Sequence, residues 1–415
     1  MSEQLYINAN IYSPKDSGSP SSGPDQGSLV TYRKGALLVK DGLIEKIGQE
    51  KDVTGSLSQD LLTNAVDCQG RALIPGFVDP HTHCCFAALR EEEFQMRAAG
   101  TPYLEILKQG GGILSSVKAV EDANVDLLYQ NTLSHIDRAM SLGTTSIEVK
   151  SGYGLRTESE LKMLEAIDRA SAHTPLDVVA TYLGAHAVPP AYKKNSDAFI
   201  TYLIEESLPA VKKQNIAEFC DVFCEEGVFS IRQGRRLLSA AQDLGMRVKI
   251  HADEVHDLGG AGLAAELGAI SADHLLAASD ENLQAMVEKG VIANLLPGTA
   301  FSLRKSYARA RDMIEMGLPV ALATDCNPGS CYTESMQFIF ALAVLNMRMT
   351  PEEALTGVTL NPAYSLGLAD KTGSLDVGKQ ADFLLLNGTT PSILAYHAGV
   401  SSVDSVYKKG VKVAG

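Results

Sequence analysis

Short apolar runs alternate with amphipathic stretches through the middle of the chain. Apolar residues recur every three or four positions over Glu158–Ala170 and Pro351–Thr356, which predicts helices, and Asp280 is placed as the N-cap of another helix over Glu281–Lys289. Between such stretches lie eight strand candidates: Ala72–Val78, Thr144–Val149, Asp177–Leu183, Glu218–Phe223, Arg247–Ile250, Ala269–Asp273, Val291–Leu296 and Pro319–Thr324. Strands that alternate with helices form parallel sheets, and eight such units over about 280 residues match a TIM (β/α)8 barrel. The competing α/β arrangement is a doubly wound open sheet, which is less favoured because no Gly-x-Gly-x-x-Gly turn follows an early strand.

Both ends of the chain have β patterns, with too little apolar surface for either to fold alone. The N-terminal part predicts a strand over Leu5–Ile11 and a hairpin that turns at Asp41-Gly42. The C-terminal part predicts a strand over Ala381–Leu386 and two more on either side of Lys409-Gly410. We therefore expect one small β-sandwich-like domain built from both chain termini, with the barrel inserted between them: residues 1–71 plus 365–415, and 72–364.

The composition is that of a globular protein, since 45% of the 415 residues are hydrophobic and 21% are charged. The formal net charge of −14 argues against a nucleic-acid partner, which would favour a basic surface. No apolar run approaches the roughly 18 residues that a membrane helix needs. The first residues also lack a basic segment followed by an apolar one, so no signal peptide is expected. We therefore expect a cytoplasmic protein with no membrane partner.

Histidines follow several strand candidates at the end where TIM barrels carry their chemistry. His81 and His83 follow the first strand, and alternation along a strand directs both to the same side. His186, His251 and His274 follow later strands, so five of the nine histidines gather at one rim, which predicts a functional site. The remaining four are expected at the surface: His135, His173, His256 and His397.

His81, His83 and His251, together with Asp325 after the eighth strand, form a set of three imidazoles and one carboxylate. Such a set suits Zn²⁺ or a non-haem iron better than Mg²⁺, which prefers oxygen ligands. Metal binding lowers the pKa of water from about 15.7 towards 7, which provides hydroxide at neutral pH. Asp325 is placed to accept a proton from that water as well as to bind the metal. The residues therefore predict a metal-dependent hydrolytic site.

These features, with a β domain made from both termini, resemble the amidohydrolase superfamily, and within it the imidazolonepropionase family. The resemblance covers nearly the whole chain and rests on these segments: Phe77–His83, Gly110–Leu114, Glu148–Leu155, Gly184–Ala187, Lys249–Glu254, Leu296–Thr299 and Ala323–Ser330. It implies that a metal-activated water opens the cyclic amide of 4-imidazolone-5-propanoate to give N-formimidoyl-L-glutamate, a step of histidine degradation. It also implies a homodimer.

The resemblance implies which residues contact the substrate. Arg90 would pair bidentately with the substrate carboxylate, although the residues alone fit a surface arginine equally well. Tyr103 and Tyr153 would hydrogen-bond to the flat ring or stack on it. Further contacts are expected from His186, Glu254, Asn327, Gly329 and Ser330. His186 and His274 are placed to polarise the carbonyl, and proton transfer to the leaving group falls to His274 or Glu254, a choice that stays open.

Many superfamily members hold two metals bridged by a carboxylated lysine on the fourth strand. That strand ends here in Cys224-Glu225-Glu226, so we expect one metal per chain, zinc or iron, and a structural or ion-paired role for Lys150. The chain departs from the family pattern at Cys84-Cys85 and Cys326, next to the predicted ligands. Thiols at these positions could alter the width of the pocket, the metal preference or the sensitivity to oxidation, and the sequence does not decide among these effects.

Three alternatives remain at this point. Another cyclic amidohydrolase or a deaminase would share the metal set, although Arg90 and Tyr153 favour an acidic substrate. A non-catalytic protein on the same barrel would be free to lose ligands, and none is missing. A zinc scaffold would use Cys220 and Cys224, but reduced thiols packed in the core are favoured for the seven cysteines.

Overall fold

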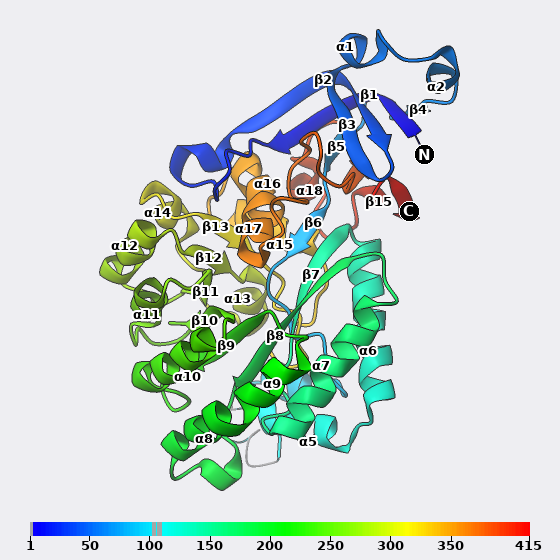
Figure 1. Ribbon diagram of the computed structural model, residues 1–415. Coiled ribbons are helices and arrows are strands. Elements are labelled where there is room, and N and C mark those ends of the chain that lie inside the picture. The colour runs from blue at the N-terminus through cyan, green and yellow to red at the C-terminus, as the bar shows by residue number, and fades with distance from the viewer. Residues whose placement is uncertain (1–2, 102–104, 106–109) are drawn as a thin grey trace.

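The computed structural model describes residues 3–101, 105 and 110–415, which form two eight-stranded sheets (Figure 1). The strands of the terminal sheet are β1 (Glu3–Pro14), β2 (Leu29–Lys40), β3 (Leu43–Gln49), β4 (Val66–Asp67), β5 (Ala72–Pro75), β14 (Phe383–Leu386), β15 (Val403–Lys408) and β16 (Val411–Ala414). The strands of the barrel are β6 (Phe77–Asp79), β7 (Thr144–Lys150), β8 (Asp177–Ala185), β9 (Phe219–Cys224), β10 (Arg247–Ala252), β11 (Ser271–His274), β12 (Ile292–Leu295) and β13 (Val320–Leu322).

The barrel strands are parallel and follow one another in chain order, as the alternating pattern predicted. The segments that continue β6 and β13 lie against each other, with Thr82 paired to Cys326. The amide of Asp325 donates to the carbonyl of His81 at 3.1 Å, and the amide of His83 donates to the carbonyl of Cys326 at 2.9 Å. These bonds join the first and last strands, so the two predicted ligand segments lie side by side.

The apolar run Ala72–Val78, which we predicted to be one strand, is divided between the two sheets. β5 pairs with β1 and β14, whereas β6 pairs with β7, and Gly76 separates them. A Cβ atom at Gly76 would lie 2.3 Å from the side chain of Thr145, so only glycine lets the chain pass this close to β7. Because β5 leads directly into β6, the terminal sheet lies at the amino ends of the barrel strands (Figure 1). The opposite rim is left free for the site.

Both termini contribute to the terminal sheet, as predicted, and they lie close together at one end of the molecule (Figure 1). The strands form a single sheet in the order β16-β15-β14-β5-β1-β2-β3, with β4 beside β1. Nζ of the buried Lys408 lies 2.5 Å from Asp177 at the start of β8 and 2.6 Å from the buried Asp382. The ion pair between Lys408 and Asp177 joins the terminal sheet to the barrel. The division of the chain into domains at residues 71 and 365 stays a prediction.

Helices surround the barrel (Figure 1). The helices of the described residues are α1 (Glu50–Thr54), α2 (Gln59–Thr63), α3 (Glu91–Ala98), α5 (Ile113–Asp122), α6 (Val125–Ser141), α7 (Thr157–Ser171), α8 (Ser196–Tyr202), α9 (Leu208–Gln214), α10 (Ile231–Asp243), α11 (Gly260–Leu267), α12 (Asp280–Lys289), α13 (Pro297–Leu303), α14 (Ala310–Glu315), α15 (Met336–Asn346), α16 (Pro351–Val358), α17 (Leu360–Leu366) and α18 (Ile393–Tyr396), with short η1 (Gly23–Gly27), η2 (Pro190–Tyr192) and η3 (Leu203–Ser207). α7 and α16 confirm the two predicted helices. The N-cap of α12 is Ser279, so the prediction of Asp280 as the cap was wrong by one residue. Among the described residues, no helix combines the length and the apolarity needed to cross a membrane.

One of the histidines expected at the surface is buried. His135 on α6 is 4% exposed, and its Nδ1 lies 2.9 Å from Glu334 and 2.6 Å from Arg138. The periodicity of α6 places His135 on the same face as the buried Leu128, Thr132 and Ala139, and its partner Glu334 lies about 200 residues away in sequence. His173, His256 and His397 are exposed, as predicted. All seven cysteines are buried and unpaired, which confirms the prediction of reduced core thiols.

Candidate active site

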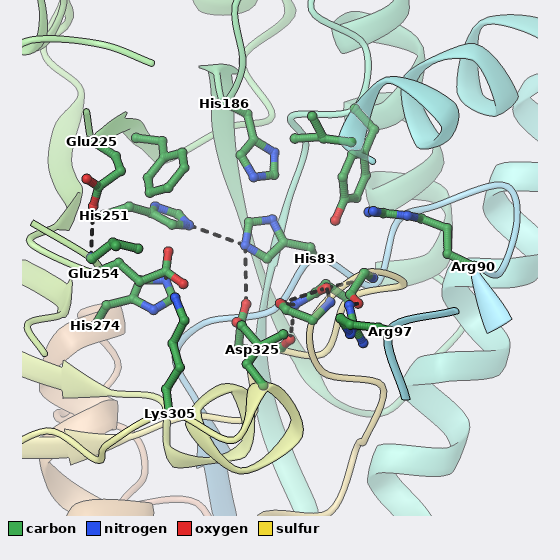
Figure 2. A pocket seen from close by; sticks show the side chains of 18 residues that line it. His83, Arg90, Arg97, His186, Glu225, His251, Glu254, His274, Lys305 and Asp325 are labelled. Atoms are coloured by element: carbon green, nitrogen blue, oxygen red, sulfur yellow. Dashed lines mark hydrogen bonds and ion pairs between the residues drawn. The ribbon is translucent and has the colours of Figure 1, made fainter. Parts of the chain in front are cut away.

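Three histidines and one aspartate converge at the carboxyl ends of the barrel strands. Nε2 of His83 lies 3.2 Å from Nε2 of His81 and 3.3 Å from Nε2 of His251. Oδ1 of Asp325 lies 3.5 Å from Nε2 of His83 and 3.7 Å from Nε2 of His81. The four side chains are buried, and Figure 2 shows His83, His251 and Asp325 pointing toward one another. The sequence prediction brought together these same four residues.

The separations fit four ligands around one cation. Zn²⁺ binds nitrogen and oxygen at about 2.0–2.2 Å, and a tetrahedral arrangement then places neighbouring ligand atoms about 3.3–3.6 Å apart. Imidazole Nε2 atoms that face one another in a buried space have lone pairs with no hydrogen-bond donor from their neighbours. A cation would satisfy these lone pairs: His81, His83 and Asp325 lie close enough together to hold a metal ion, and Nε2 of His251 lies 3.3 Å from Nε2 of His83.

Two buried carboxylates orient the imidazoles. Nδ1 of His81 lies 2.6 Å from Oδ2 of Asp273, and Nδ1 of His251 lies 2.9 Å from Oδ2 of Asp221. An imidazole that donates its Nδ1 proton to a carboxylate presents the lone pair of Nε2 on its other side, which is the usual arrangement of metal-binding histidines. Both Nε2 atoms face His83 here, as this arrangement requires.

Burial also sets the protonation of the ligands. It lowers the pKa of His81 and His83 well below the usual histidine value, which keeps both imidazoles neutral. Burial acts in the same direction on His251, but the charge of Asp221 outweighs it and raises the pKa of His251. Burial raises the pKa of Asp325. His81 and His83 are therefore in the neutral form that binds a metal.

The turn after β13 holds Asp325 in place. The backbone of Asp325 has a φ of 55°, which is uncommon for a non-glycine residue, and Oδ2 of its side chain accepts a hydrogen bond from the hydroxyl of Thr299. The amide nitrogen of the Asn327 side chain donates to the carbonyl of Asp325 at 2.7 Å. Its oxygen accepts from the amides of Gly329 at 2.8 Å and Ser330 at 2.7 Å. Asn327 therefore shapes this turn.

A cavity of about 600 Å³ opens beside the four ligands. Arg90 lines it from the side opposite His251 and His274 (Figure 2). Nε and Nη2 of Arg90 donate to the carboxylate of Glu93 at 2.9 and 2.6 Å, so the edge that we expected to pair bidentately with the substrate is engaged within the protein. A Cβ atom at Gly329 would lie 2.4 Å from Nη1 of Arg90. The guanidinium is thus held between Glu93 and Gly329, with Nη1 as its remaining donor group.

Aromatic rings and a carboxylate complete the lining. The ring of His186 stacks on His83, with centroids 4.9 Å apart, and Tyr153 lies 5.3 Å from His186. Burial lowers the pKa of His186 to about 3, so this imidazole is neutral. Nε2 of His274 lies 3.9 Å from Oε2 of Glu254, and the His274 backbone has a φ of 79°. These two residues stand next to each other at the metal-ligand end of the cavity (Figure 2).

The structure brings most of the predicted site residues to this one cavity. Those that line it are His83, Arg90, Tyr153, His186, His251, Glu254, His274, Asp325, Asn327, Gly329 and Ser330. His81 lies behind them, in contact with His83. Tyr103 lies outside the described residues. The individual roles assigned to these residues stay predictions.

Several contributors were not among the predicted site residues. Asp221 and Asp273 orient the ligands, Thr299 holds Asp325, and Arg97 and Lys305 add positive charge to the lining. A signal for Asp221 was present, because it is a charged residue among apolar ones in β9, and Asp273 stands next to the predicted His274 at the end of its strand. For Arg97 there was no comparable signal, since it lies on α3, a polar helix without buried residues, and its Nη1 donates to the carbonyl of Gly329 at 2.8 Å.

The barrel, the terminal sheet and the ligand set define a metal-dependent hydrolase of the amidohydrolase class. The family model described as "Amidohydrolase family" matches residues 72–413. Solved structures with the same fold include 5-methylcytosine deaminase from Klebsiella pneumoniae, with a TM-score of 0.74 and 17% identity over 99% of this chain and 97% of that one. Another is an adenosine deaminase from Xanthomonas campestris with bound zinc, with a TM-score of 0.72 and 18% identity over 99% and 92%.

Sequence relatives narrow the assignment. The imidazolonepropionase of Desulfotalea psychrophila is 65% identical over 413 residues, which cover 100% of both chains. The imidazolonepropionase of Syntrophobacter fumaroxidans is 55% identical over 409 residues, 99% of this chain and 96% of that one. The chain belongs to the amidohydrolase family and, within it, to the imidazolonepropionases. The family prediction from the sequence is confirmed.

Proposed function

We propose that the chain hydrolyses the cyclic amide bond of 4-imidazolone-5-propanoate to give N-formimidoyl-L-glutamate in histidine degradation. The observation that carries this proposal is the convergence of three imidazole nitrogens and Oδ1 of Asp325 beside a cavity with Arg90 on its far side. The arrangement offers a hydrolytic centre for the ring and a cation for the propanoate group. The relatives at 65% and 55% identity support the same reaction.

In this reaction the oxygen of water bonds to the ring carbonyl carbon, and the bond from that carbon to the ring nitrogen breaks. The nitrogen leaves as part of the formimidoyl group and takes up a proton. One metal ion per chain, zinc or iron, held by His81, His83, His251 and Asp325, would supply Lewis-acid chemistry by polarising the carbonyl and lowering the pKa of water.

The chain's own groups position the substrate and move the protons. The carboxylate of Asp325 takes the proton of the attacking water, and Thr299 fixes this carboxylate by donating to its Oδ2. His186 and His274 polarise the carbonyl, and either His274 or Glu254, 3.9 Å apart, returns a proton to the leaving nitrogen. Nη1 of Arg90 receives the propanoate carboxylate, and Tyr153 and His186 contact the ring.

The test is ring opening of freshly prepared 4-imidazolone-5-propanoate, followed by loss of ultraviolet absorbance, with metal content measured on the same sample. We expect rapid turnover with about one metal per chain. A sample that carries the metal and leaves this compound intact would move the substrate to another cyclic amide. From the family resemblance we also propose a homodimer in the cytoplasm, which light scattering and cell fractionation would check.

A further inference from the structure

Two lysines are buried beneath the candidate active site. Lys150 ends β7 and Lys249 lies in β10, and both have 0% exposure. Neither lines the cavity among the described residues, so neither is placed to touch a substrate. A buried ammonium group is costly unless carboxylates compensate it, so the partners of each lysine indicate what it stabilises.

The partners of Lys150 are the carboxylates that orient the ligand histidines. Its Nζ lies 2.7 Å from Oε2 of Glu148, 2.9 Å from Oδ2 of Asp221 and 3.9 Å from Oδ2 of Asp273. Oδ2 of Asp221 is also the oxygen that contacts His251 at 2.9 Å, and Oδ2 of Asp273 is the oxygen that contacts His81 at 2.6 Å. One ammonium group is therefore joined, through a single oxygen on each side, to two of the four ligands.

We propose that Lys150 is a positioning residue for the metal site, which holds Asp221 and Asp273 so that His81 and His251 present Nε2 to the ion. Without the ammonium group, Glu148 would keep its pair with Lys249, but Asp221 and Asp273 would be buried near each other and near Glu148 with no cation between them. Their repulsion would turn them away from one another, and each imidazole would lose the acceptor that fixes its ring. The inference extends the site of the proposed function and concerns metal binding before any substrate enters.

Lys249 provides a matched control. It has the same charge and burial, and its Nζ lies 2.9 Å from Oε1 of Glu148 and donates to the carbonyl of Pro80 at 3.1 Å. Its ion pair is with Glu148, which contacts neither His81 nor His251 in the described structure. Replacing Lys249 therefore removes a buried cation from the same barrel while leaving both links from Lys150 to the ligand histidines.

The experiment compares Lys150→Met with Lys249→Met. Each metal-free protein is titrated with Zn²⁺ alone against a competing chelator, without substrate, and its thermal unfolding is recorded in parallel. Absorption spectra of the Co²⁺-loaded forms report the geometry at the ion. We expect Lys150→Met to weaken Zn²⁺ binding about 10- to 100-fold and to change the Co²⁺ spectrum. Lys249→Met should lower the unfolding temperature while Zn²⁺ affinity and spectrum change far less.

The proposal is overturned if Lys150→Met binds Zn²⁺ as the unmodified chain does, or if both variants lose the same affinity. Should Lys150→Met fail to fold, the double variant Lys150→Met with Glu148→Gln restores the balance of buried charge. It should fold and still bind Zn²⁺ weakly, and tight binding by it would overturn the proposal instead. Because no substrate is present, a failure of the ring-opening assay leaves this test unaffected.

Discussion

Replacing Arg90 by alanine tests how the cavity recognises its substrate. Nε and Nη2 of Arg90 are held by Glu93, so we expect Nη1 alone to meet the propanoate carboxylate. A hydrogen bond to a charged group contributes about 1.5–3 kcal/mol. Since each 1.36 kcal/mol corresponds to a factor of ten, Arg90→Ala should lower kcat/KM by about 10- to 150-fold. The change should fall mainly on KM, because the carboxylate is remote from the bond that breaks.

The assay compares the acid substrate with its neutral methyl ester. The unmodified chain should prefer the acid, and Arg90→Ala should lose most of that preference. The matched control is Arg235→Ala, because Arg235 makes the same side-on pair with Glu266 at 2.7 and 2.7 Å but lies on the surface, with a side chain 43% exposed. Arg235→Ala should leave kcat/KM unchanged for both the acid and the ester.

Two results would refute the reasoning about Arg90. One is an unchanged KM for the acid substrate in Arg90→Ala, which would mean that another group receives the carboxylate. The other is an equal loss for acid and ester, which would mean that Arg90 only supports the turn at Gly329. In the second case Glu93→Gln should reproduce the loss, since Glu93 holds Arg90 in place.

Three further predictions follow from other parts of the structure. Asp325→Asn should abolish nearly all turnover with little change in the far-ultraviolet circular dichroism, and activity close to that of the unmodified chain would refute its role. Burial acts to raise the pKa of Glu334, but its hydrogen bonds with His135 and Arg138 outweigh this effect and lower that pKa. The ionised Glu334 therefore stabilises the folded state at pH values above the ordinary pKa of about 4.3. This stabilisation is lost as the pH falls through the lower pKa of the folded state. Urea unfolding of the metal-free protein should therefore show a gap between the unmodified chain and Glu334→Gln that closes below about pH 4. Lys408→Met leaves the buried Asp382 without its partner and removes the pair with Asp177 of β8, so it should cost about 3–5 kcal/mol in urea unfolding. A loss below about 1 kcal/mol would show that Lys408 does not hold the terminal sheet to the barrel.

The positions of the ligands could be predicted because they depend on local pattern. The spacing of His81 and His83 fixes their common direction wherever the backbone is extended, and pairing of Thr82 with Cys326 keeps it extended beyond β6. His251 and Asp325 follow the strand candidates Arg247–Ile250 and Pro319–Thr324. Parallel strands in a barrel bring their carboxyl ends to one rim, so the four residues meet.

Other features depend on contacts between distant segments. Pro75-Gly76 inside the apolar run Ala72–Val78 marks a break, but the pattern does not show that the residues on either side join different sheets, because both sheets bury such residues. His135 lies at helical spacing from the buried Leu128, Thr132 and Ala139 of α6, so its burial follows the local pattern, whereas its partner Glu334 lies 199 positions away. For Arg90, the pairing with Glu93 three residues later was visible in the sequence, but its direction toward the cavity depends on Gly329.

The charged residues inside the strands carry information that a hydrophobic pattern discards. Glu148 and Lys150 lie two positions apart on β7 and therefore point to the same side, where Asp221 of β9 meets them. Buried charges of this kind do not maximise the stability of the fold, since apolar side chains of similar size would fill the same space without the cost of removing charges from water. The presence of this charged cluster beneath His81 and His251 is explained if the charges set the orientation of the two imidazole rings. On this reasoning, a charged residue within an apolar barrel strand near its carboxyl end indicates a partner of the ligands, even when it never reaches the cavity.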